Sequence, residues 1–175
     1  MAGYVEGLLT RARDYLILSG VAGVIVGLDQ WTKYLVRSRL AVGEIWAPIP
    51  ALSPYVRIVH WNNTGAAFGL FPSGGLAFTL VAIVVSLAII YYFPRVPGGQ
   101  SLLRFALALQ LGGAIGNLID RLLLGTVTDF VSVGTFPVFN VADSCISIGV
   151  ALLVAGMWVE ERRHRAGLPE EPGPV

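Results

Sequence analysis

Two aspartates, Asp129 and Asp143, have the residue type and spacing that best support chemistry. Gly134 and Pro137 lie between them and break regular structure, so a turn there could fold the segment back and bring the two carboxyl groups together. Two adjacent carboxyl groups tend to share one proton, because both cannot easily ionise. The ionised group can take a proton from water, while the protonated group polarises a carbonyl or protonates a leaving amine. Such a pair would hydrolyse an amide bond without a metal or a covalent intermediate.

The acids also have structural interpretations that the sequence leaves open. Asn140 could cap a helix, with Asp143 three positions later facing the free amides of the first turn. Asp29 and Lys33 are four positions apart with the acid first, so they can pair along one helix face. Asp120 cannot face the arginine that follows it within a helix, and we therefore expect its partner elsewhere in the chain.

Other kinds of site find little support in the sequence. Cys145 is the only cysteine, so there is neither an intrachain disulfide nor a metal-type cysteine spacing. The two histidines, His60 and His164, are far apart and have no partner pattern for a metal. Nucleotide-binding glycine loops and serine-hydrolase motifs are absent from the sequence. From these absences we expect no metal and no cofactor. The formal net charge is +1 and there is no basic block, so we also expect no nucleic-acid partner.

The composition is that of a membrane protein. Hydrophobic residues make up 55% of the chain and charged residues 13%, whereas roughly a quarter of a soluble domain is charged. A helix needs about 20 mainly apolar residues to cross the hydrocarbon core. Four stretches qualify, at residues 15–36, 75–93, 102–124 and 141–159. We therefore expect a mainly α-helical membrane protein with four transmembrane helices.

Four acids fall where a charge is expensive. An ionisable group within a membrane span costs about 3 kcal/mol or more and is a functional-site hypothesis by default. If the spans alternate in direction, four acids lie near the span ends at one membrane face: Asp29, Asp120, Asp129 and Asp143. Most of the other acids lie at termini or in loops. This convergence on one membrane face is the main functional clue.

Small residues predict where the helices pack. Ser19, Gly23 and Gly27 recur every four positions and would share one face of the first span. Gly112 and Gly116 form a G-x-x-x-G pattern in the third span, which is also typical of a helix packing face. We expect close helix contacts at both places.

Basic residues predict the orientation of the chain. More of them fall on the side that carries Arg11, Arg13 and the arginines after residue 160, which favours cytoplasmic termini. We expect residues 1–14 to be a cytoplasmic segment and residues 15–160 to be the transmembrane domain. Residues 161–175 would be a cytoplasmic tail, and its proline- and glutamate-rich end predicts disorder.

The two connections on the other side, at about residues 38–73 and 125–140, have the composition of strands. In the first, Val56 to Trp61 follow a period of two, with alternate residues on opposite faces. The second is rich in β-branched and aromatic residues and has glycine and proline as breakers. Together they predict a small external sheet on the outer membrane face.

Four motifs occur in order along the chain: DQWTK at 29–33, NNTGAAF at 62–68, GNLIDRLLLGTVTDF at 116–130 and FNVADS at 139–144. Together they resemble the lipoprotein signal peptidase (signal peptidase II) family of bacterial inner-membrane aspartyl proteases. The resemblance covers about residues 15–160 and implies four transmembrane helices, an external β-cradle and a short amphipathic helix.

The resemblance also implies a role for each matched residue. Asp129 and Asp143 match the catalytic pair. Residues that would line the site or bind substrate are Asn63, Asn117, Arg121 and Asn140, and those with a structural role are Asp29, Lys33 and Asp120. The implied substrate is a prolipoprotein with a diacylglyceryl-modified cysteine, cut on the amino side of that cysteine. The site would lie near the outer face, with membrane lipids as partners.

Two non-enzymatic alternatives remain open at this point. A small proton- or ion-coupled carrier would use intramembrane aspartates, but it would be expected to show internal repeats with interrupted helices. A structural adaptor would use the same acids as helix caps and ion pairs. An Asp129→Asn variant separates a hydrolase from an adaptor, because it should abolish hydrolysis but be tolerated by an adaptor. A carrier would show ion-dependent flux in liposomes, which a peptidase should lack.

Overall fold

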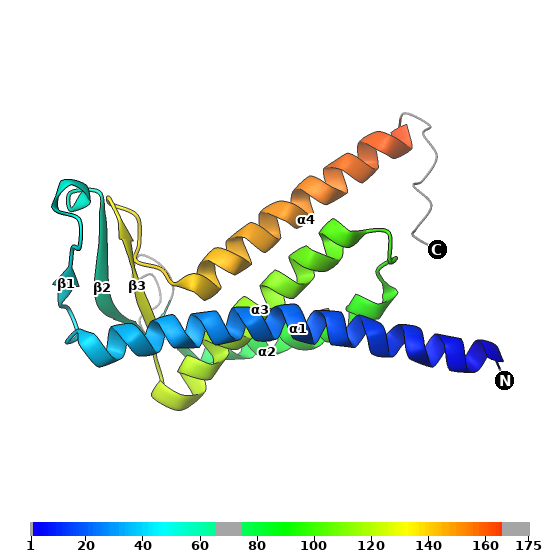
Figure 1. Ribbon diagram of the computed structural model, residues 1–175, viewed down its shortest axis with the longest axis horizontal. Helices are drawn as coiled ribbons and strands as arrows, with labels where there is room; N and C mark the ends of the chain where they lie inside the picture. The colour runs from blue at the N-terminus through cyan, green and yellow to red at the C-terminus, as the bar shows by residue number, and fades with distance from the viewer. Residues whose placement is uncertain (1, 66–74, 166–175) are drawn as a thin grey trace.

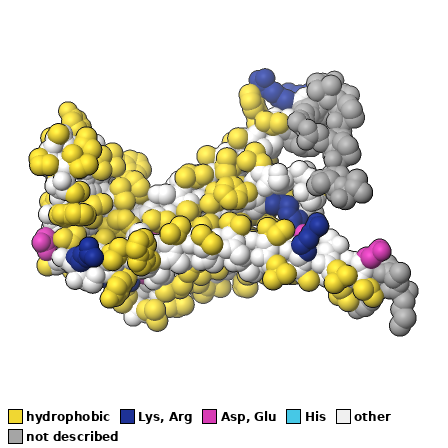
Figure 2. Space-filling view, viewed as in Figure 1, with side chains coloured by type: hydrophobic (Ala, Val, Ile, Leu, Met, Phe, Trp, Pro, Cys, Tyr) yellow, Lys and Arg dark blue, Asp and Glu magenta, His cyan; other side chains and the backbone are white. Residues whose placement is uncertain are grey.

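Four long helices form the body of the molecule. The structure is a computed structural model that describes residues 2–65 and 75–165, and within them the helices are α1 (Ala2–Arg39), α2 (Gly75–Tyr92), α3 (Ser101–Leu124) and α4 (Val141–Arg165). Each is long and apolar enough to cross a membrane. Figure 2 shows hydrophobic side chains along the middle of the molecule and charged ones toward its two ends. The predicted four-helix membrane fold is confirmed.

The first and last helices extend beyond the predicted spans. Helix α1 begins at Ala2 and not near Tyr15, and α4 continues to Arg165. No proline interrupts either extension, so the backbone continues as helix after the apolar stretch has ended. Hydropathy therefore located the membrane-crossing part of each helix but not its ends. The tail predicted to be disordered is residues 161–175, and α4 includes residues 161–165 of it. Residues 166–175, and residues 66–74 of the first long connection, lie outside the described residues.

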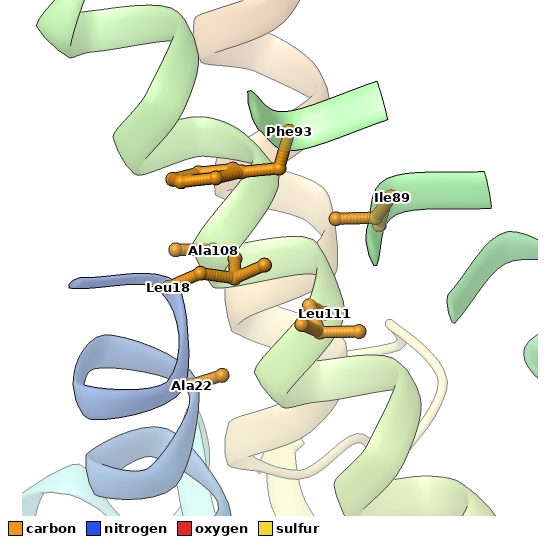
Figure 3. Packing of buried hydrophobic residues seen from close by; sticks show 6 residues of the cluster. All are labelled: Leu18, Ala22, Ile89, Phe93, Ala108 and Leu111. Atoms are coloured by element: carbon orange, nitrogen blue, oxygen red, sulfur yellow. The ribbon is translucent and has the colours of Figure 1, made fainter. Parts of the chain in front are cut away.

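Helix α3 is the centre of the bundle and packs against α1, α2 and α4. Part of the core lies where α1, α3 and the end of α2 meet the one-turn helix η3 (Phe93–Arg95), as Figure 3 shows. This cluster consists of Leu18, Ala22, Ile89, Phe93, Ala108 and Leu111. Through Phe93, the connection between α2 and α3 therefore packs against α1 and α3.

Glycines in α3 permit the closest helix contacts. A Cβ atom added at Gly112 would lie 2.7 Å from the Cβ of Ile25 in α1. One added at Gly116 would lie 2.6 Å from Oδ2 of Asp29 and 3.4 Å from the Cβ of Ala142 in α4. The packing role predicted for the G-x-x-x-G pattern is confirmed, because no side chain fits at either position.

The packing face predicted for α1 is wrong. Ser19, Gly23 and Gly27 are exposed, and among the described residues no atom beyond the helix's own backbone lies within 4 Å of a Cβ added at either glycine. The face that packs against α3 instead carries Ile25 and the fully buried Asp29. Burying the charged residues of α1 against α3 fixes the rotation of this helix, so its small residues turn outward.

A three-stranded antiparallel sheet lies at one end of the helices. Its strands are β1 (Ile45–Trp46), β2 (Val56–Asn63) and β3 (Val127–Val133), in the order β1-β2-β3. The start of α1 and the end of α4 lie at the opposite end (Figure 1). The small sheet predicted from the two connections is confirmed. A one-turn helix, η1 (Pro50–Leu52), joins β1 to β2.

The predicted period of two in β2 is interrupted by a bulge. Ile58 pairs with Val131 and Trp61 with Asp129, so β2 contains one extra residue between these pairs. Two consecutive residues of β2, Val59 and His60, are therefore both buried. The bulge sets which residues of β2 share a face with Asp129.

Candidate active site

The turn after β3 brings the chain back past Asp129. Gly134 has a φ of 52°, a left-handed conformation that glycine adopts without steric cost. The returning chain pairs Phe139 with Val131, whose amide and carbonyl both bond to Phe139, at 2.7 and 3.1 Å. Asn140 follows directly and lies beside Asp129. The fold-back predicted from the breakers between the two aspartates is therefore present.

Asn140 caps α4 and joins the two aspartates. Its Oδ1 accepts a hydrogen bond from the amide of Asp143 at 2.9 Å, and its own amide donates to Oδ2 of Asp143 at 3.2 Å. This reciprocal pair is a capping box. The side-chain Nδ2 of Asn140 also donates to Oδ1 of Asp129 at 2.7 Å. The capping interpretation and the paired-carboxyl interpretation therefore describe the same cluster.

Asn117 of α3 holds the other side of Asp143. Its Nδ2 donates to Oδ1 of Asp143 at 2.7 Å. Its Oδ1 accepts from Lys33 Nζ at 2.9 Å and from Asn140 Nδ2 at 3.1 Å. These three partners fix the orientation of the amide, because oxygen faces the donors and nitrogen faces the carboxylate.

Asn63 of β2 completes the set of donors around Asp129. Its Nδ2 donates to Oδ2 of Asp129 at 2.8 Å. Trp61 lies directly opposite Asp129 in the sheet, so Asn63, two positions further along β2, is the diagonal neighbour of Asp129 on the same face. Each oxygen of the two carboxyl groups thus accepts a hydrogen bond from an asparagine.

Burial and charge raise the affinity of Asp129 for a proton. Burial, and then the nearby carboxyl group of Asp143, raise the pKa of Asp129 to about 7, while hydrogen bonds from Asn63 and Asn140 and the charge of Lys33 act in the opposite direction. Asp129 therefore keeps its proton up to near-neutral pH. A pair holding one proton has both the base and the acid that amide hydrolysis requires.

A buried ion pair supports the site from α1. Lys33 Nζ lies 2.7 Å from Oδ2 of Asp29, and both side chains are fully buried. The other oxygen of Asp29 accepts from the amide of Ala142 at 3.0 Å, in the first turn of α4. The i,i+4 pair interpreted as structural therefore also holds α4 in place, through the free amides of its first turn.

Asp120 has its partners on other elements, as the sequence predicted. Its Oδ2 accepts from the amide of Thr128 at 2.9 Å and lies 3.4 Å from Lys33 Nζ. Its Oδ1 accepts from Gln30 at 3.1 Å. Asp120 therefore joins α1 and α3 to the strand that carries Asp129.

Arg121 is placed differently from the other matched residues. Its guanidinium lies over the ring of Phe78 in α2, at 5.7 Å. Among the described residues no carboxylate lies within ion-pair distance of it, and its side chain is outside the asparagine network. Its predicted role in binding substrate stays a prediction.

The structure contains a buried ion pair that sequence reasoning missed. Asp14 is buried and pairs with Arg104, whose NH1 also donates to the carbonyl of Val96 at 3.0 Å and whose guanidinium lies over Phe93 at 4.4 Å. Asp14 is thus buried, although it lies at the end of the segment 1–14 that was predicted to be cytoplasmic. The signal that could have revealed it was Arg104 itself, a charge inside a predicted span that needed a partner.

The four long helices and the two carboxyl groups held by asparagines define a multi-pass membrane protein with the site of an enzyme, and comparison with known proteins agrees. Two solved structures of bacterial membrane enzymes match it with TM-scores of 0.78 and 0.72. The first is 29% identical, covering 89% of this chain and 94% of the other. The second is 32% identical, covering 81% and 92%.

Sequence comparison identifies the family. The family model described as signal peptidase (SPase) II matches residues 21–159. A lipoprotein signal peptidase of Anoxybacillus flavithermus is 40% identical over 157 residues, 87% of this chain and 92% of the relative. One of Halalkalibacterium halodurans is 42% identical over 149 residues, 83% and 94%. The chain belongs to the signal peptidase II family and is a peptidase, and the carrier alternative finds no support.

Proposed function

We propose that the chain is an aspartic endopeptidase that removes the signal peptide from diacylglyceryl-modified prolipoproteins, cutting on the amino side of the lipidated cysteine. Family membership supports the prolipoprotein substrate. One observation carries the aspartic mechanism: Asn140 binds both Asp129 and Asp143, each of which is held by a second asparagine. Such preorganisation is what a shared-proton carboxyl pair needs.

The proposed chemistry uses a single proton on the pair. The ionised carboxyl group takes a proton from water as the water oxygen attacks the scissile carbonyl carbon. The protonated group donates a hydrogen bond to the carbonyl oxygen and stabilises its developing negative charge. When the carbon–nitrogen bond breaks, the leaving amine receives a proton from the pair. Asn63, Asn117 and Asn140 hold the carboxyl oxygens in place during both steps.

The position of the pair at one end of the helices supports a lipid-anchored substrate. Asp143 lies in the first turn of α4, and Asp129 lies in the sheet that covers the same end of the bundle. Acyl chains could remain in the bilayer while the peptide bond is held near the interface with access to water. The cysteine lipid and the surrounding membrane lipids are therefore the proposed partners.

The proposed location is the bacterial inner membrane, with both termini in the cytoplasm and the active site near the outer face. The start of α1 and the end of α4 both lie at the end of the molecule away from the sheet, although they diverge from each other there (Figure 1). Arg11 and Arg13 lie at this end of α1, where cytoplasmic basic residues are expected. A cysteine introduced at Ser38, which lies near the sheet end of α1, should react with a membrane-impermeant thiol reagent in intact cells.

The test is cleavage of a diacylglyceryl-modified prolipoprotein by the purified protein in detergent. Wild type should cut, whereas Asp129→Asn and Asp143→Asn should each lose at least about 10³-fold in kcat, as removal of an essential acid or base does. Both variants keep the shape of the side chain and should stay folded. Glu161→Gln is the control, because Glu161 is exposed at the far end of α4. Normal cleavage by either aspartate variant would refute the assignment.

A further inference from the structure

Thr128, the residue before Asp129, is held by three different parts of the protein. Its amide donates to Asp120 of α3 at 2.9 Å. Its carbonyl accepts from Nδ2 of Asn140 at 3.4 Å. Its hydroxyl Oγ1 accepts from NH1 of Arg37, in α1, at 3.1 Å. The side chain is 1% exposed, so the hydroxyl is removed from water and depends on this bond.

Arg37 reaches this position from the last turns of α1. The same NH1 lies 3.5 Å from Oδ1 of Asp120, so the guanidinium bridges the carboxylate of α3 and the hydroxyl of β3. Arg37 keeps 28% of its side-chain surface exposed. Unlike Lys33, which is fully buried beside Asp29, it can be replaced without leaving an acid buried and unpaired, because Asp120 retains Lys33 and Gln30.

The contact bears directly on the geometry of Asp129. Asn140 binds the carbonyl of Thr128 and Oδ1 of Asp129 with the same nitrogen atom. A shift of Thr128 along or across the sheet would therefore change the hydrogen bond from Asn140 that orients the carboxyl group of Asp129. Displacement of a reacting group by about 1 Å can cost about 10²-fold in rate.

We propose that Arg37 and Thr128 form a positioning pair that fixes β3 against α1 and so orients Asp129 for catalysis. The proposal rests on the proposed function, in which Asp129 is one of the two catalytic carboxyl groups. Arg37 acts through Thr128 and Asp120 and not on the substrate.

A purely structural role, in which Arg37 only ties α1 to the sheet, makes a different prediction. It would lower stability but leave the folded enzyme with its normal pH profile. A positioning role changes the hydrogen bonds that Asp129 receives from Asn63 and Asn140, and with them the pH dependence of the rate. The charged groups that act on Asp129 are Asp143 and Lys33, and Asp29, Asp120 and Arg121 lie beside them. A substitution at Thr128 changes no charge, whereas Arg37→Met also removes a positive charge beside Asp120.

The variants are Thr128→Val, which removes only the hydroxyl, and Arg37→Met. We expect each to lower kcat about tenfold, a fraction of the loss that a full 1 Å displacement produces, with KM changed less than about twofold. Thr128→Ser, which keeps a hydroxyl, should retain most of the rate. Arg39→Met is the matched control, because Arg39 is exposed, carries the same charge and lies two positions further along α1; it should leave kcat unchanged.

A double-mutant cycle tests whether the two residues act together. The Arg37→Met, Thr128→Val double variant should be no slower than either single variant, and the alkaline limb of kcat should move to higher pH in all three. Independent, multiplied losses would overturn the pair. So would an unchanged pH limb, a normal kcat in folded Thr128→Val, or an equal loss in Arg39→Met.

A readout without substrate separates this proposal from the proposed function. The infrared band of the protonated Asp129 carboxyl group can be assigned by its loss in Asp129→Asn. Its titration midpoint should rise in Thr128→Val, which removes the contact with Arg37 without changing a charge. If wild type fails to cleave, the proposed function is wrong. An Asp129 titration identical in wild type and Thr128→Val would then still overturn the positioning pair, and a raised midpoint in this uncharged variant would support it.

Discussion

Replacing Gly116 with alanine tests how closely the buried charges are packed. A Cβ atom there would lie 2.6 Å from Oδ2 of Asp29 and 3.1 Å from its Cγ. This oxygen is the one that pairs with Lys33 at 2.7 Å. Since ordinary van der Waals contact begins near 3.4 Å, the Asp29 carboxylate must move by several tenths of an ångström. The neighbouring oxygen would then also lose its bond to the amide of Ala142.

The magnitude follows from two effects. Overpacking a well-packed interior costs about 1–3 kcal/mol, and separating a buried ion pair completely costs about 3–5 kcal/mol. Lys33 would keep Asn117 at 2.9 Å and Asp120 at 3.4 Å, so only part of the second cost applies. We expect Gly116→Ala to lower the free energy of unfolding by about 2–3 kcal/mol.

The assay is reversible unfolding in mixed detergent micelles, followed by circular dichroism. Gly23→Ala is the matched control, because Gly23 is also in a helix but an added Cβ there would meet no described atom of another element within 4 Å. That change should alter stability by no more than about 1 kcal/mol, the difference in helix propensity between the two residues. Equal stability of the two variants would refute the close-packing argument.

Three further predictions address the pair, the second ion pair and the end of α3. Activity should fall as pH rises through about 7, because Asp129 then loses its proton. Asn63→Ala removes a donor to the ionised form, so the pKa of Asp129 and the alkaline limb should both rise; an unmoved limb in a pH–rate profile would contradict this. Arg104→Met leaves Asp14 buried without its partner and should cost about 3–5 kcal/mol in detergent unfolding, with normal kcat in the folded fraction. Gly125→Ala should cost about 1 kcal/mol by the same assay, because the φ of 74° at this C-cap is strained for alanine.

Short-range spacing along the chain predicts much of the site. The i,i+4 spacing of Asp29 and Lys33 predicted their pairing, and the three-residue spacing of Asn140 and Asp143 predicted the cap. Both rules describe neighbours within one helix or at its first turn, where backbone geometry alone sets the distance. The position of Asn117 in the site came from the family resemblance, because spacing cannot predict contacts between helices.

The contacts between elements were beyond sequence reasoning. The rotation of α1 exposed Gly23, contrary to the predicted packing face, and buried Asp14 against Arg104, a contact that was not predicted. Arg37 and Thr128 are far apart in the chain, and their residue types carry no signal of the contact they make. These features depend on how whole helices and strands settle against one another.

The sequence by itself determined the membrane class, the four spans, the family and the local pairs, because hydropathy, motif order and helical spacing are written along the chain. Only the tertiary structure decided which oxygen of each carboxyl group faces which asparagine, and how Asp129 meets Asp143. The bulge in β2, the left-handed turn at Gly134 and the rotation of α1 set those geometries. Each of these geometries results from simultaneous packing against several neighbouring elements, and a pattern along the sequence cannot predict that packing.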